Sequence, residues 1–302
     1  MTVRNEASDR EPASRVDEAI VDYYDETWID YRLLWLNRDN LAVHFGYADD
    51  STRGHTEALK NMNRVLAERV AIEPGERVLD AGCGVGGSSL WLAQERDAEV
   101  VGITPVASQV AMARRYTAER GMAHRVRFQQ ADYAATPFSE ASFDVVWTLE
   151  ALCHAPSKAA FYREAARLLR PGGRVVVAEY VRTDRPVDAR GERLLHEWLN
   201  GWAIPDIDTP EEHQAHLAAA GFIDIRLDDV TAHTRPSLRR LYRMAYSTYP
   251  LAVLARLLRI RSHTQHKNVI GSLRQYQALN HKSWFYSIIS ATKPILPTHS
   301  TS

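Results

Sequence analysis

A carboxylate and a group of glycines stand together early in the chain, where they could hold a charged ligand. Asp80 ends a short strand-like run. A glycine-rich turn follows it, at Gly82, Gly84, Gly86 and Gly87. Glycine permits unusual backbone angles and a close approach to a ligand, and the helical pattern from Ser88 adds free N–H groups. Because a carboxylate suits a cation better than a phosphate, this segment predicts a cradle for a cationic cofactor.

Further candidate residues, most of them polar, stand where three other predicted strands end. In open α/β sheets ligands bind at the carboxyl ends of the strands, so these residues are the next candidates. They are Thr104 and Gln109 after the second strand, Asp132 and Tyr133 after the third, and Leu149, Glu150 and His154 after the fourth. We expect them to line one site together with the glycine turn.

Other uses of a glycine turn fit these residues less well. The glycines lack the GxGxxG spacing of dinucleotide-binding proteins, and the absence of a following Lys-Ser or Lys-Thr pair excludes a phosphate-binding loop.

The twelve histidines are scattered, and no Cys/His set has the spacing of a zinc site. His213 and His216 form the one pair of note, which we expect on a solvated helix face. No metal is therefore predicted.

The elements that position these residues alternate between strand-like and helical patterns. Strand-like runs cover 77–81, 99–103, 126–131, 143–149, 174–180, 222–230 and 283–292. Helical runs cover 88–95, 106–120 and 158–169, and the last stops at a turn over 170–173. The alternation predicts an α/β fold with a seven-stranded, mostly parallel Rossmann-like sheet and helices on both faces.

Four segments are expected along the 302 residues. Residues 1–13 are polar and predicted to be disordered, and 14–76 should form an N-terminal helical cover, with a helical pattern over 15–70. Residues 77–181 form the cofactor-binding core. Residues 182–302 complete the sheet and carry an inserted helical cap at about 235–280.

Cysteine usage and hydropathy suggest a cytoplasmic protein. Cys83 and Cys153 are the two cysteines, and both lie in motif-like segments, so a disulfide framework is not expected. The sequence has no apolar run of about 20 residues and no leading basic and apolar segment. A membrane span and a signal peptide are therefore not expected.

The net charge of −1 hides an asymmetry along the chain. After Asp229 there are eleven basic residues and no acidic one, whereas the preceding part has 26 basic against 38 acidic residues. The basic tail could pack on acidic surface within the chain or between subunits of a homo-oligomer. It could also bind an anionic substrate or a nucleic acid. The aliphatic residues at 251–258 argue against a nucleic-acid arm, and no nucleic-acid partner is predicted.

Several of these segments resemble the class I S-adenosylmethionine-dependent methyltransferases, over about residues 77–181 and more loosely over the whole chain. The segment Glu150-Ala-Leu-Cys-His-Ala-Pro156 is similar to a motif of the sterol C-methyltransferases, as are 23–25 and 80–87. The segment 102–105, Gln109 and the closing segment 286–294 are similar to the tocopherol methyltransferases. The resemblance implies methyl transfer to carbon of a hydrophobic, isoprenoid-bearing small molecule in secondary metabolism.

The resemblance also implies roles for the residues at the strand ends. The cofactor-binding set is Asp80, Gly82, Gly84, Thr104, Gln109, Asp132, Tyr133 and Leu149. Asp80 would pair with the amino-acid end of S-adenosylmethionine, a charge-assisted contact of about 1.5–3 kcal/mol. Thr104 stands where an acid usually holds the ribose hydroxyls, and Gln109 would replace that acid. Asp132 would accept a hydrogen bond from the adenine amino group, with Tyr133 beside the ring.

Transfer of methyl from a sulfonium is an in-line displacement, so the site must align donor and acceptor and exclude water. An alkene acceptor would become a carbocation, which aromatic rings stabilise by about 0.5–2 kcal/mol each. Tyr23 and Tyr24 are the expected catalytic rings, and Glu150 and His154 are the candidate bases that remove the proton. The expected substrate-binding residues are Trp28, Trp35, His44, Tyr242 and Tyr246.

Alternative interpretations stay open for several of these residues. The aromatic cluster near the N-terminus could be a helical cover packed on the sheet, and Tyr242 and Tyr246 could form an ordinary packing face. Glu150 could be a hydrogen-bond partner of the donor or of a nearby tyrosine, and His154 could orient a loop. The enzymatic alternative is N- or O-methylation of an aromatic or alkaloid-like metabolite. An RNA-binding methyltransferase-like module is the alternative from another class.

Overall fold

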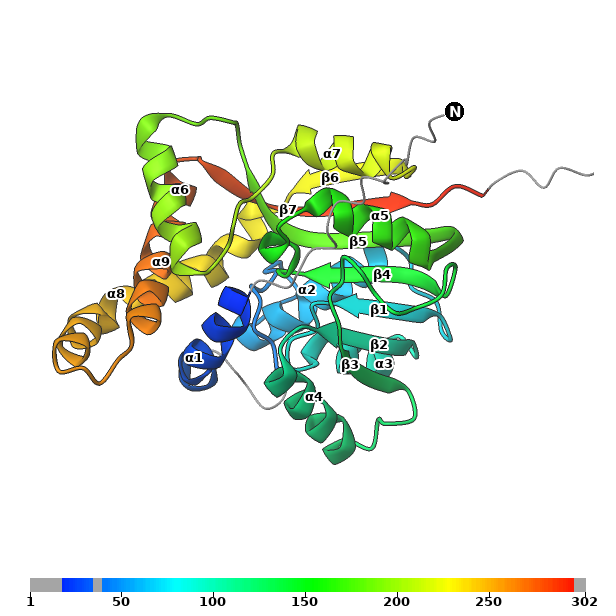
Figure 1. The fold of residues 1–302 in the computed structure, drawn as a ribbon, viewed down its shortest axis with the longest axis horizontal. Helices are drawn as coiled ribbons and strands as arrows, with labels where there is room; N and C mark the ends of the chain where they lie inside the picture. Colours follow the sequence, from blue (N-terminus) through cyan, green and yellow to red (C-terminus); the bar gives the residue numbers. More distant parts are fainter. Residues whose placement is uncertain (1–17, 35–39, 296–302) are drawn as a thin grey trace, which may run out of the picture.

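Seven strands form one sheet in the order β3-β2-β1-β4-β5-β7-β6 (Figure 1). The computed structural model describes residues 18–34 and 40–295, with side chains described for 20–28 and 40–295. The strands are β1 (Arg77–Ala81), β2 (Glu99–Thr104), β3 (Val126–Gln130), β4 (Phe143–Leu149), β5 (Leu169–Arg182), β6 (Ile223–Asp229) and β7 (Trp284–Thr292). β7 runs antiparallel to β5 and β6, and the other neighbouring strands are parallel. The predicted seven-stranded, mostly parallel Rossmann-like sheet is confirmed.

Helices cover both faces of the sheet because the side chains of each strand alternate between the faces. On β4, Trp147 packs into one core and Val146 into the other. Residues of α2 (His55–Arg69), α3 (Gly87–Glu95) and α4 (Ala107–Glu119) join the core of Trp147. Residues of α5 (Lys158–Leu168) and α7 (Pro210–Ala219) join the core of Val146. The two apolar cores, one on each face of the sheet, hold the parallel strands so that their carboxyl ends lie along the same side of the sheet.

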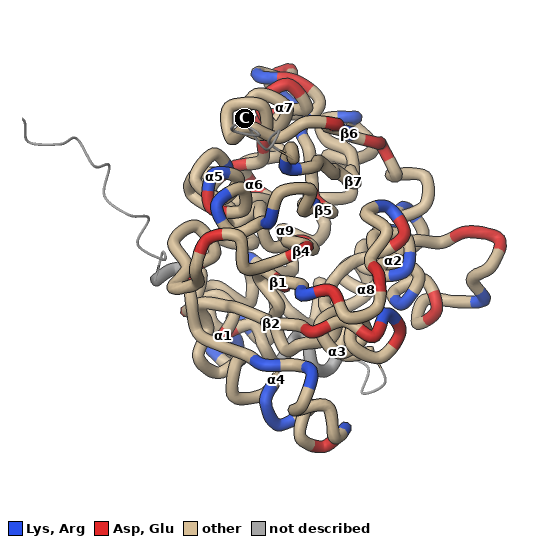
Figure 2. Tube along the Cα trace, turned by 90° about the vertical axis from the view of Figure 1, so that its right-hand side faces the viewer, with Lys and Arg blue, Asp and Glu red and all other residues tan. Residues whose placement is uncertain are grey.

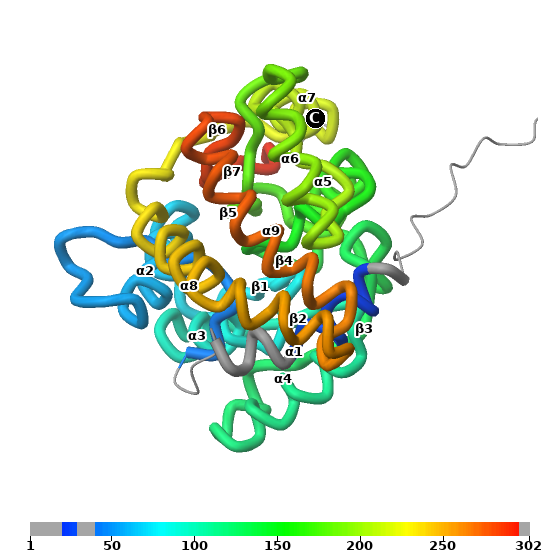
Figure 3. The backbone as a smooth tube through the Cα atoms, turned by 90° about the vertical axis from the view of Figure 1, so that its left-hand side faces the viewer, coloured from blue at the N-terminus to red at the C-terminus, as the bar shows by residue number. Residues whose placement is uncertain are grey.

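A third group of helices lies at those carboxyl ends. It consists of α1 (Glu18–Leu34), α6 (Ala189–Gly201), α8 (Thr231–Leu257) and α9 (His263–Asn280). In the sequence α8 and α9 stand between β6 and β7, and in Figure 3 they lie in front of the sheet. α9 contacts α1, α6 and α8. These four helices therefore form a cap over the strand ends.

Residues 40–54 form a loop, although the sequence pattern over 15–70 predicted helix. Leu41, His44 and Phe45 of this loop are buried. The backbone amide of Phe45 donates a hydrogen bond to Oε1 of Glu150 at 2.7 Å. The helix prediction was wrong here because this segment buries its apolar residues as a loop. The hydrogen bond from Phe45 to Glu150 ties the loop to the end of β4.

The start of β5 also differs from the prediction. β5 begins at Leu169 and contains the segment 170–173, which was predicted as a turn. The register with β4 shifts between Phe143 and Val145, and Gly172 has a φ of +79°. The glycines of this segment therefore form an irregularity within the strand rather than end it.

In the Cα trace of Figure 2, basic and acidic residues are interspersed over the elements in view. In the acid-free tail, Arg274 of α9 pairs with Glu197 of α6 at 2.5 Å, and Lys293 donates to the carbonyl of Leu169 at 2.7 Å. Part of the basic tail thus packs within the chain. None of the described helices is long and apolar enough to cross a bilayer.

Candidate active site

The glycine turn after β1 forms one wall of a cavity at the strand ends. Gly82 has a φ of +90°, in the left-handed region that favours glycine. A Cβ atom at Gly82 would lie 2.2 Å from the Cβ atom of Ala151, so a larger residue does not fit. We call this hollow of about 100 Å³ the strand-end cavity. It is lined by α1, residue 43 and the segments that follow β1 to β4, including Tyr24, Trp28, Gly84, Gln109, Asp132 and Glu150.

Asp80 lies beneath the glycine turn and is not among the residues that line the strand-end cavity. The hydroxyl of Ser89, near the start of α3, donates to Oδ2 of Asp80 at 2.5 Å. Burial raises the pKa of Asp80 to about 6. The carboxyl therefore ties α3 to the end of β1, and a direct contact between Asp80 and a ligand stays a prediction.

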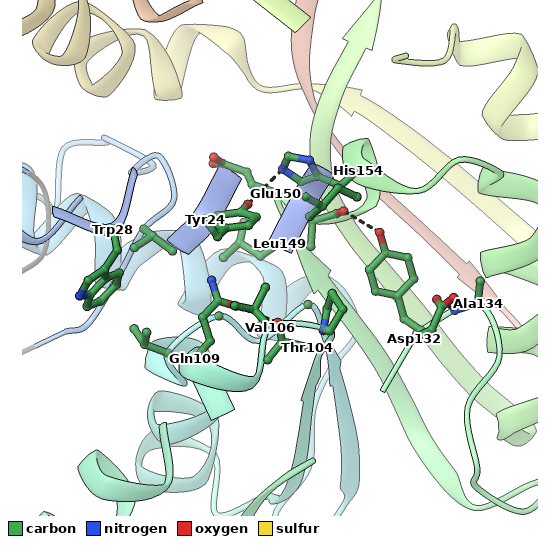
Figure 4. A pocket seen from close by; sticks show the side chains of 18 of the residues that line it. Tyr24, Trp28, Thr104, Val106, Gln109, Asp132, Ala134, Leu149, Glu150 and His154 are labelled. Carbon is green, nitrogen blue, oxygen red and sulfur yellow. Dashed lines mark hydrogen bonds between the residues drawn. The ribbon is translucent and has the colours of Figure 1, made fainter. Parts of the chain in front are cut away.

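Thr104 and Gln109 form a hydrogen-bonded pair on the wall of the strand-end cavity. Oγ1 of Thr104 accepts from the amide of Val106 at 3.3 Å, and its hydroxyl donates to Oε1 of Gln109 at 2.7 Å. The side-chain amide nitrogen of Gln109 points into the cavity (Figure 4). Gln109 therefore presents a donor at the place where dinucleotide-binding folds have a carboxylate acceptor, and a sugar hydroxyl can accept from it.

Asp132, Tyr133 and Leu149 line the same cavity (Figure 4). Oδ1 of Asp132 accepts from the amide of Ala134 at 2.8 Å, which fixes the turn after β3. The hydroxyl of Tyr133 donates to the carbonyl of Ala151 at 3.1 Å. The predicted residues at the ends of β3 and β4 are thus brought together across one cavity.

A second, larger cavity lies under the cap and has a volume of about 420 Å³. We call it the cap cavity. Its walls are mainly aromatic and aliphatic, with Tyr23, Phe45, Tyr180, Trp202, Ile204, Leu241, Met244 and Val269 among them. α8 contributes small side chains, Ala245, Ala252 and Ala255. A cavity of this size and lining suits a hydrophobic small molecule.

The two cavities meet at four residues that line both, Tyr24, Val43, Glu150 and His154. The carboxyl group of Glu150 accepts three hydrogen bonds at this junction. Oε1 accepts from the amide of Phe45 and the hydroxyl of Tyr286, both at 2.7 Å. Oε2 accepts from the hydroxyl of Tyr180 at 2.5 Å. Glu150 is therefore a partner of tyrosines, which is the structural alternative that the sequence left open.

The environment of Glu150 also changes its acidity and strains its backbone. Burial raises the pKa of Glu150 to about 7, against the opposing effect of the three hydrogen bonds. Its φ of +52° lies in the left-handed region, a conformation that costs a residue of this type about 1–3 kcal/mol. The surrounding contacts thus hold a carboxyl that titrates near neutrality at the junction of the two cavities.

His154 is a neutral hydrogen-bond acceptor at the same junction. Its Nδ1 lies 3.3 Å from the carbonyl of Ala203, which can only accept, so Nδ1 carries the proton. Nε2 then accepts from the hydroxyl of Tyr24 at 3.0 Å. Burial lowers the pKa of His154 to about 4. The pair of Tyr24 and His154 therefore places a neutral base beside both cavities.

Tyr23 and His44 stand on the wall of the cap cavity. The hydroxyl of Tyr23 donates to Oδ1 of Asn268 at 2.9 Å and so joins α1 to α9. Nδ1 of His44 lies 2.9 Å from the carbonyl of Phe45. Burial lowers the pKa of His44 to about 4, so this imidazole is neutral at pH 7.

Comparison with known proteins decides the family. A family model described as a methyltransferase domain matches residues 79–177. The 27-O-demethylrifamycin SV methyltransferase of Amycolatopsis mediterranei (strain S699) is 35% identical, over 73% of this chain and 76% of its own length. The chain belongs to the class I S-adenosylmethionine-dependent methyltransferases.

Other relatives of this methyltransferase have names that refer to either carbon or oxygen. The sterol 24-C-methyltransferase of Pneumocystis carinii (strain B80) is 29% identical over 72% of this chain and 55% of its own length. The tocopherol O-methyltransferase of Arabidopsis thaliana is 32% identical over 79% of this chain and 72% of its own length. The crystal structure of the [4+2]-cyclase SpnF is similar with a TM-score of 0.76 and 27% identity, over 93% of this chain and 98% of that one. The expected resemblance to sterol and tocopherol methyltransferases is confirmed.

The lining of the strand-end cavity fits the methyl donor of this family. S-adenosylmethionine carries a sulfonium and an ammonium group, and none of the described residues that line this cavity is Lys or Arg. The carboxylates of Asp132 and Glu150 line it instead. The cofactor of the methyltransferase is S-adenosylmethionine, as predicted.

Four of the residues predicted to bind substrate differ from that expectation or cannot be placed. Trp28 lines the strand-end cavity and not the cap cavity, and Trp35 lies outside the described residues. Tyr242 lines neither cavity and stacks on Tyr276 at 4.9 Å, while Tyr246 is 68% exposed. The small and medium side chains of α8, rather than its tyrosines, face the cap cavity, and a contact of Tyr242 or Tyr246 with substrate stays a prediction.

Three residues of the site were missed by sequence reasoning. Tyr180 and the backbone of Phe45 carry no motif, and Glu179 lies inside a predicted strand. Oε2 of Glu179 accepts from the amide of Cys153 at 2.7 Å, and burial raises its pKa to about 8. It therefore positions the short helix 152–154 that carries His154. Tyr286 lay within the segment similar to the tocopherol methyltransferases, but no role was assigned to it.

The pair of histidines on α7 also needs a correction. His213 is buried rather than solvated, and its Nδ1 is hydrogen-bonded to the hydroxyl of Tyr162 at 2.9 Å. His216 lies 3.3 Å from a carboxylate oxygen of Asp208. His213 faces the core because α7 packs against α5. In the part of the chain that the structure describes, no three His, Cys, Asp or Glu side chains gather as metal ligands would.

Proposed function

We propose that this methyltransferase transfers a methyl group to a carbon atom of a hydrophobic, isoprenoid-bearing small molecule held in the cap cavity. One observation carries the proposal. The two cavities meet at the carboxyl group of Glu150, and the walls of the cap cavity are mainly aromatic and aliphatic. Arg261, in the turn after α8, is the one Lys or Arg among the described residues that line the cap cavity.

The donor would be held by the residues of the strand-end cavity. The glycine turn allows its close approach, and the side-chain amide of Gln109 can donate to a ribose hydroxyl. Asp132 offers a carboxylate oxygen to an adenine amino group, as predicted. When bound, S-adenosylmethionine supplies an electrophilic methyl group on a positively charged sulfur.

The junction residues would align the acceptor and exclude water. The π electrons of an acceptor double bond form the new C–CH₃ bond while the C–S bond breaks, which leaves a neutral thioether and a carbocation on the acceptor. Tyr24 lines both cavities and Phe45 lines the cap cavity, so their rings would be the ones to face that cation. The carboxylate of Glu150 adds a negative charge. A proton then leaves the neighbouring carbon for a base at the junction, with Nε2 of His154 or Glu150 as the candidates.

A second candidate is methylation of a hydroxyl group, and the contact between Tyr24 and His154 favours it. A hydroxyl that replaces Tyr24 as the donor to Nε2 of His154 could lose its proton there as it attacks the methyl group. The names of the rifamycin and tocopherol relatives also refer to O-methylation or O-demethylated substrates. For this reaction the charge of Glu150 matters less, because no carbocation forms.

The experiment that separates these proposals follows the methyl group itself. The full chain is incubated with methyl-labelled S-adenosylmethionine and a panel of prenyl diphosphates, prenylated indoles, sterols and phenols. NMR then locates the label in each product. Label on carbon supports the proposal, whereas label found on oxygen or nitrogen alone would refute it. Equal turnover of charged and neutral prenyl compounds, independent of salt, would show that the basic tail does not select anions.

A further inference from the structure

The end of α8 and the turn into α9 project from the molecule at the lower left of Figure 1. We call this part the apolar tip and define it as Tyr246, Leu251, Leu254, Leu257, Leu258 and Ile260. These side chains are between 51% and 75% exposed. Among the described residues, Ile223 and Ile295 are the remaining large apolar side chains with comparable exposure. Exposed apolar surface is therefore concentrated at the tip, which is the pattern of an interaction site.

Basic residues lie within the apolar tip and behind it on α8, and no acidic residue follows Asp229 in the sequence. Glu26 of α1 is an acidic neighbour, since it accepts a hydrogen bond from the hydroxyl of Ser262 at 2.6 Å. Arg256 and Arg259 lie within the tip, and Arg243 is exposed further back on α8. None of these three arginines forms an ion pair with a described residue. Their positive charge is therefore available to a negatively charged partner.

The order of these residues along α8 suits a lipid surface. With a rise of 1.5 Å per residue, Arg243 lies about 20 Å from Leu257 along the axis of α8. Leu257 can therefore enter a lipid layer while Arg243 stays outside it. Interfacial helices bury apolar side chains about 5–10 Å into the boundary of headgroups and acyl chains. Leu254, Leu257 and Leu258 can enter that layer, while the long side chain of Arg259 reaches back to the phosphates.

The apolar tip is continuous with the cap cavity. Leu251 and Ile260 belong to the tip and also line the cavity. They are 68% and 74% exposed, so two residues of the cavity wall also reach the surface of the tip. A hydrophobic molecule could pass from a bilayer into the cap cavity at this point without crossing water.

We propose that the apolar tip docks on the surface of an anionic lipid bilayer and that the acceptor enters the cap cavity from the lipid. The docking rests only on the exposed side chains of the apolar tip and on the charge of the neighbouring arginines. The entry route rests in addition on the proposed function, because it requires a hydrophobic acceptor.

Flotation of the full chain with vesicles tests the docking. The vesicles contain either phosphatidylcholine alone or an equal mixture with phosphatidylglycerol. We expect the wild-type protein to float with the mixed vesicles. The triple variant Leu254→Ser, Leu257→Ser, Leu258→Ser should bind at least tenfold more weakly. Replacement of Arg256 and Arg259 by Gln should weaken binding to mixed vesicles about fivefold for each residue, which is about 1 kcal/mol per basic group, and should not change binding to neutral vesicles.

Two controls each make one change of the same kind elsewhere on the surface. Ile223→Ser removes an exposed apolar side chain from β6, and Arg163→Gln removes an exposed arginine from α5. Both should float like the wild type. Wild-type protein that stays with neither vesicle, or tip variants that float like the controls, would overturn the proposal. So would light scattering that shows a dimer, dissociated by the triple leucine variant, in a protein without vesicle binding.

The vesicle assay needs no turnover, so its outcome is separate from that of the proposed function. If vesicles bind and no hydrophobic acceptor is methylated, the docking stands and the acceptor class is wrong. If detergent-dispersed isoprenoids are methylated by a protein that binds no vesicles, the proposed function stands and the docking is wrong.

Discussion

Replacement of Glu150 by Gln removes the charge at the junction of the two cavities and keeps the shape of the side chain. In the wild-type protein the pKa of Glu150 is about 7, whereas its ordinary value is 4.5. A carboxyl with a raised pKa prefers to be protonated in the folded state. The free energy of unfolding therefore falls as the pH rises from 4.5 to about 7, because the folded state resists ionisation of Glu150. Above pH 7 the free energy of unfolding stays at this lower value.

The size of this effect follows from the difference between the two pKa values. One pKa unit corresponds to 1.36 kcal/mol, so burial of the ionised Glu150 carboxylate lowers the free energy of unfolding by about 3 kcal/mol at pH 8. The glutamine of the variant cannot ionise, but its amide accepts fewer hydrogen bonds than the carboxylate, a loss of about 1 kcal/mol. We therefore expect Glu150→Gln to be about 2 kcal/mol more stable than the wild type at pH 8, and about equal to it at pH 5.

Urea unfolding of both proteins at pH 5 and pH 8 measures this difference. Comparison of the variant with the wild type cancels the buried carboxyl of Asp80, whose pKa is also raised. Glu179 is coupled to Glu150, whose charge contributes to its raised pKa, so the measured difference includes the response of Glu179. If the difference between the two proteins changes by less than about 0.5 kcal/mol between the two pH values, Glu150 does not titrate as a buried carboxyl and the reasoning is refuted.

The same variant tests the chemistry. A carbon acceptor needs the negative charge beside its carbocation, and removal of one preorganised charge-stabilising group typically lowers kcat by about 10²–10³-fold. The wild-type rate should rise with pH through a value at or below 7, because the cationic donor favours the ionised form of Glu150. The variant should lose this pH dependence. For an oxygen acceptor we expect less than a tenfold loss, so a small effect would favour the second candidate function.

Three further predictions follow from the cavities and the glycine turn. Tyr24→Phe keeps the ring beside the junction, so for a carbon acceptor it should lower kcat less than tenfold, whereas Tyr24→Ala should lower it much further; release of S-adenosylhomocysteine measures both. Ala252→Trp should fill the cap cavity and raise the KM for the acceptor at least tenfold, while calorimetry shows unchanged donor binding. Gly82→Ala should lower the free energy of unfolding by more than about 2 kcal/mol, because the strain of a positive φ adds to the contact with Ala151. The control Gly121→Ala, at a φ of +67° in open space, should lower the free energy of unfolding by about 1 kcal/mol.

The sheet and the strand-end cavity could be predicted because the sequence features that encode them are local. The apolar runs that become β1 to β4 are bounded by polar residues, and parallel strands bring such ends to one edge. For this reason Gln109, Asp132 and Glu150 could be assigned to one site before their distances were known. Asp80 shows the limit of this reasoning. Its position at a strand end was predicted, but the contact with Ser89 turns its side chain beneath the turn.

The cap cavity could not be predicted in the same way. Its wall on α8 is made of small and medium side chains, and a helical pattern gives no sign that space is left beside Ala245, Ala252 and Ala255. Large aromatic residues such as Tyr242 attract attention in a sequence, yet Tyr242 packs on α9. Which face of a cap helix borders a cavity depends on the packing of α8 against α9, and that packing is not encoded in the periodicity of α8 alone.

The environment of Glu150 depends on contacts between segments far apart in the chain. Tyr180 and Tyr286 stand opposite each other in the antiparallel pair of β5 and β7, which brings both hydroxyls to one carboxyl group. The third donor, the amide of Phe45, comes from the loop that closes over β4. β7 follows the cap helices directly, so the position of the Tyr286 hydroxyl depends on how the cap packs. The cap therefore bounds the cavity for the acceptor and also fixes, through Tyr286, the carboxyl group at which the two cavities meet.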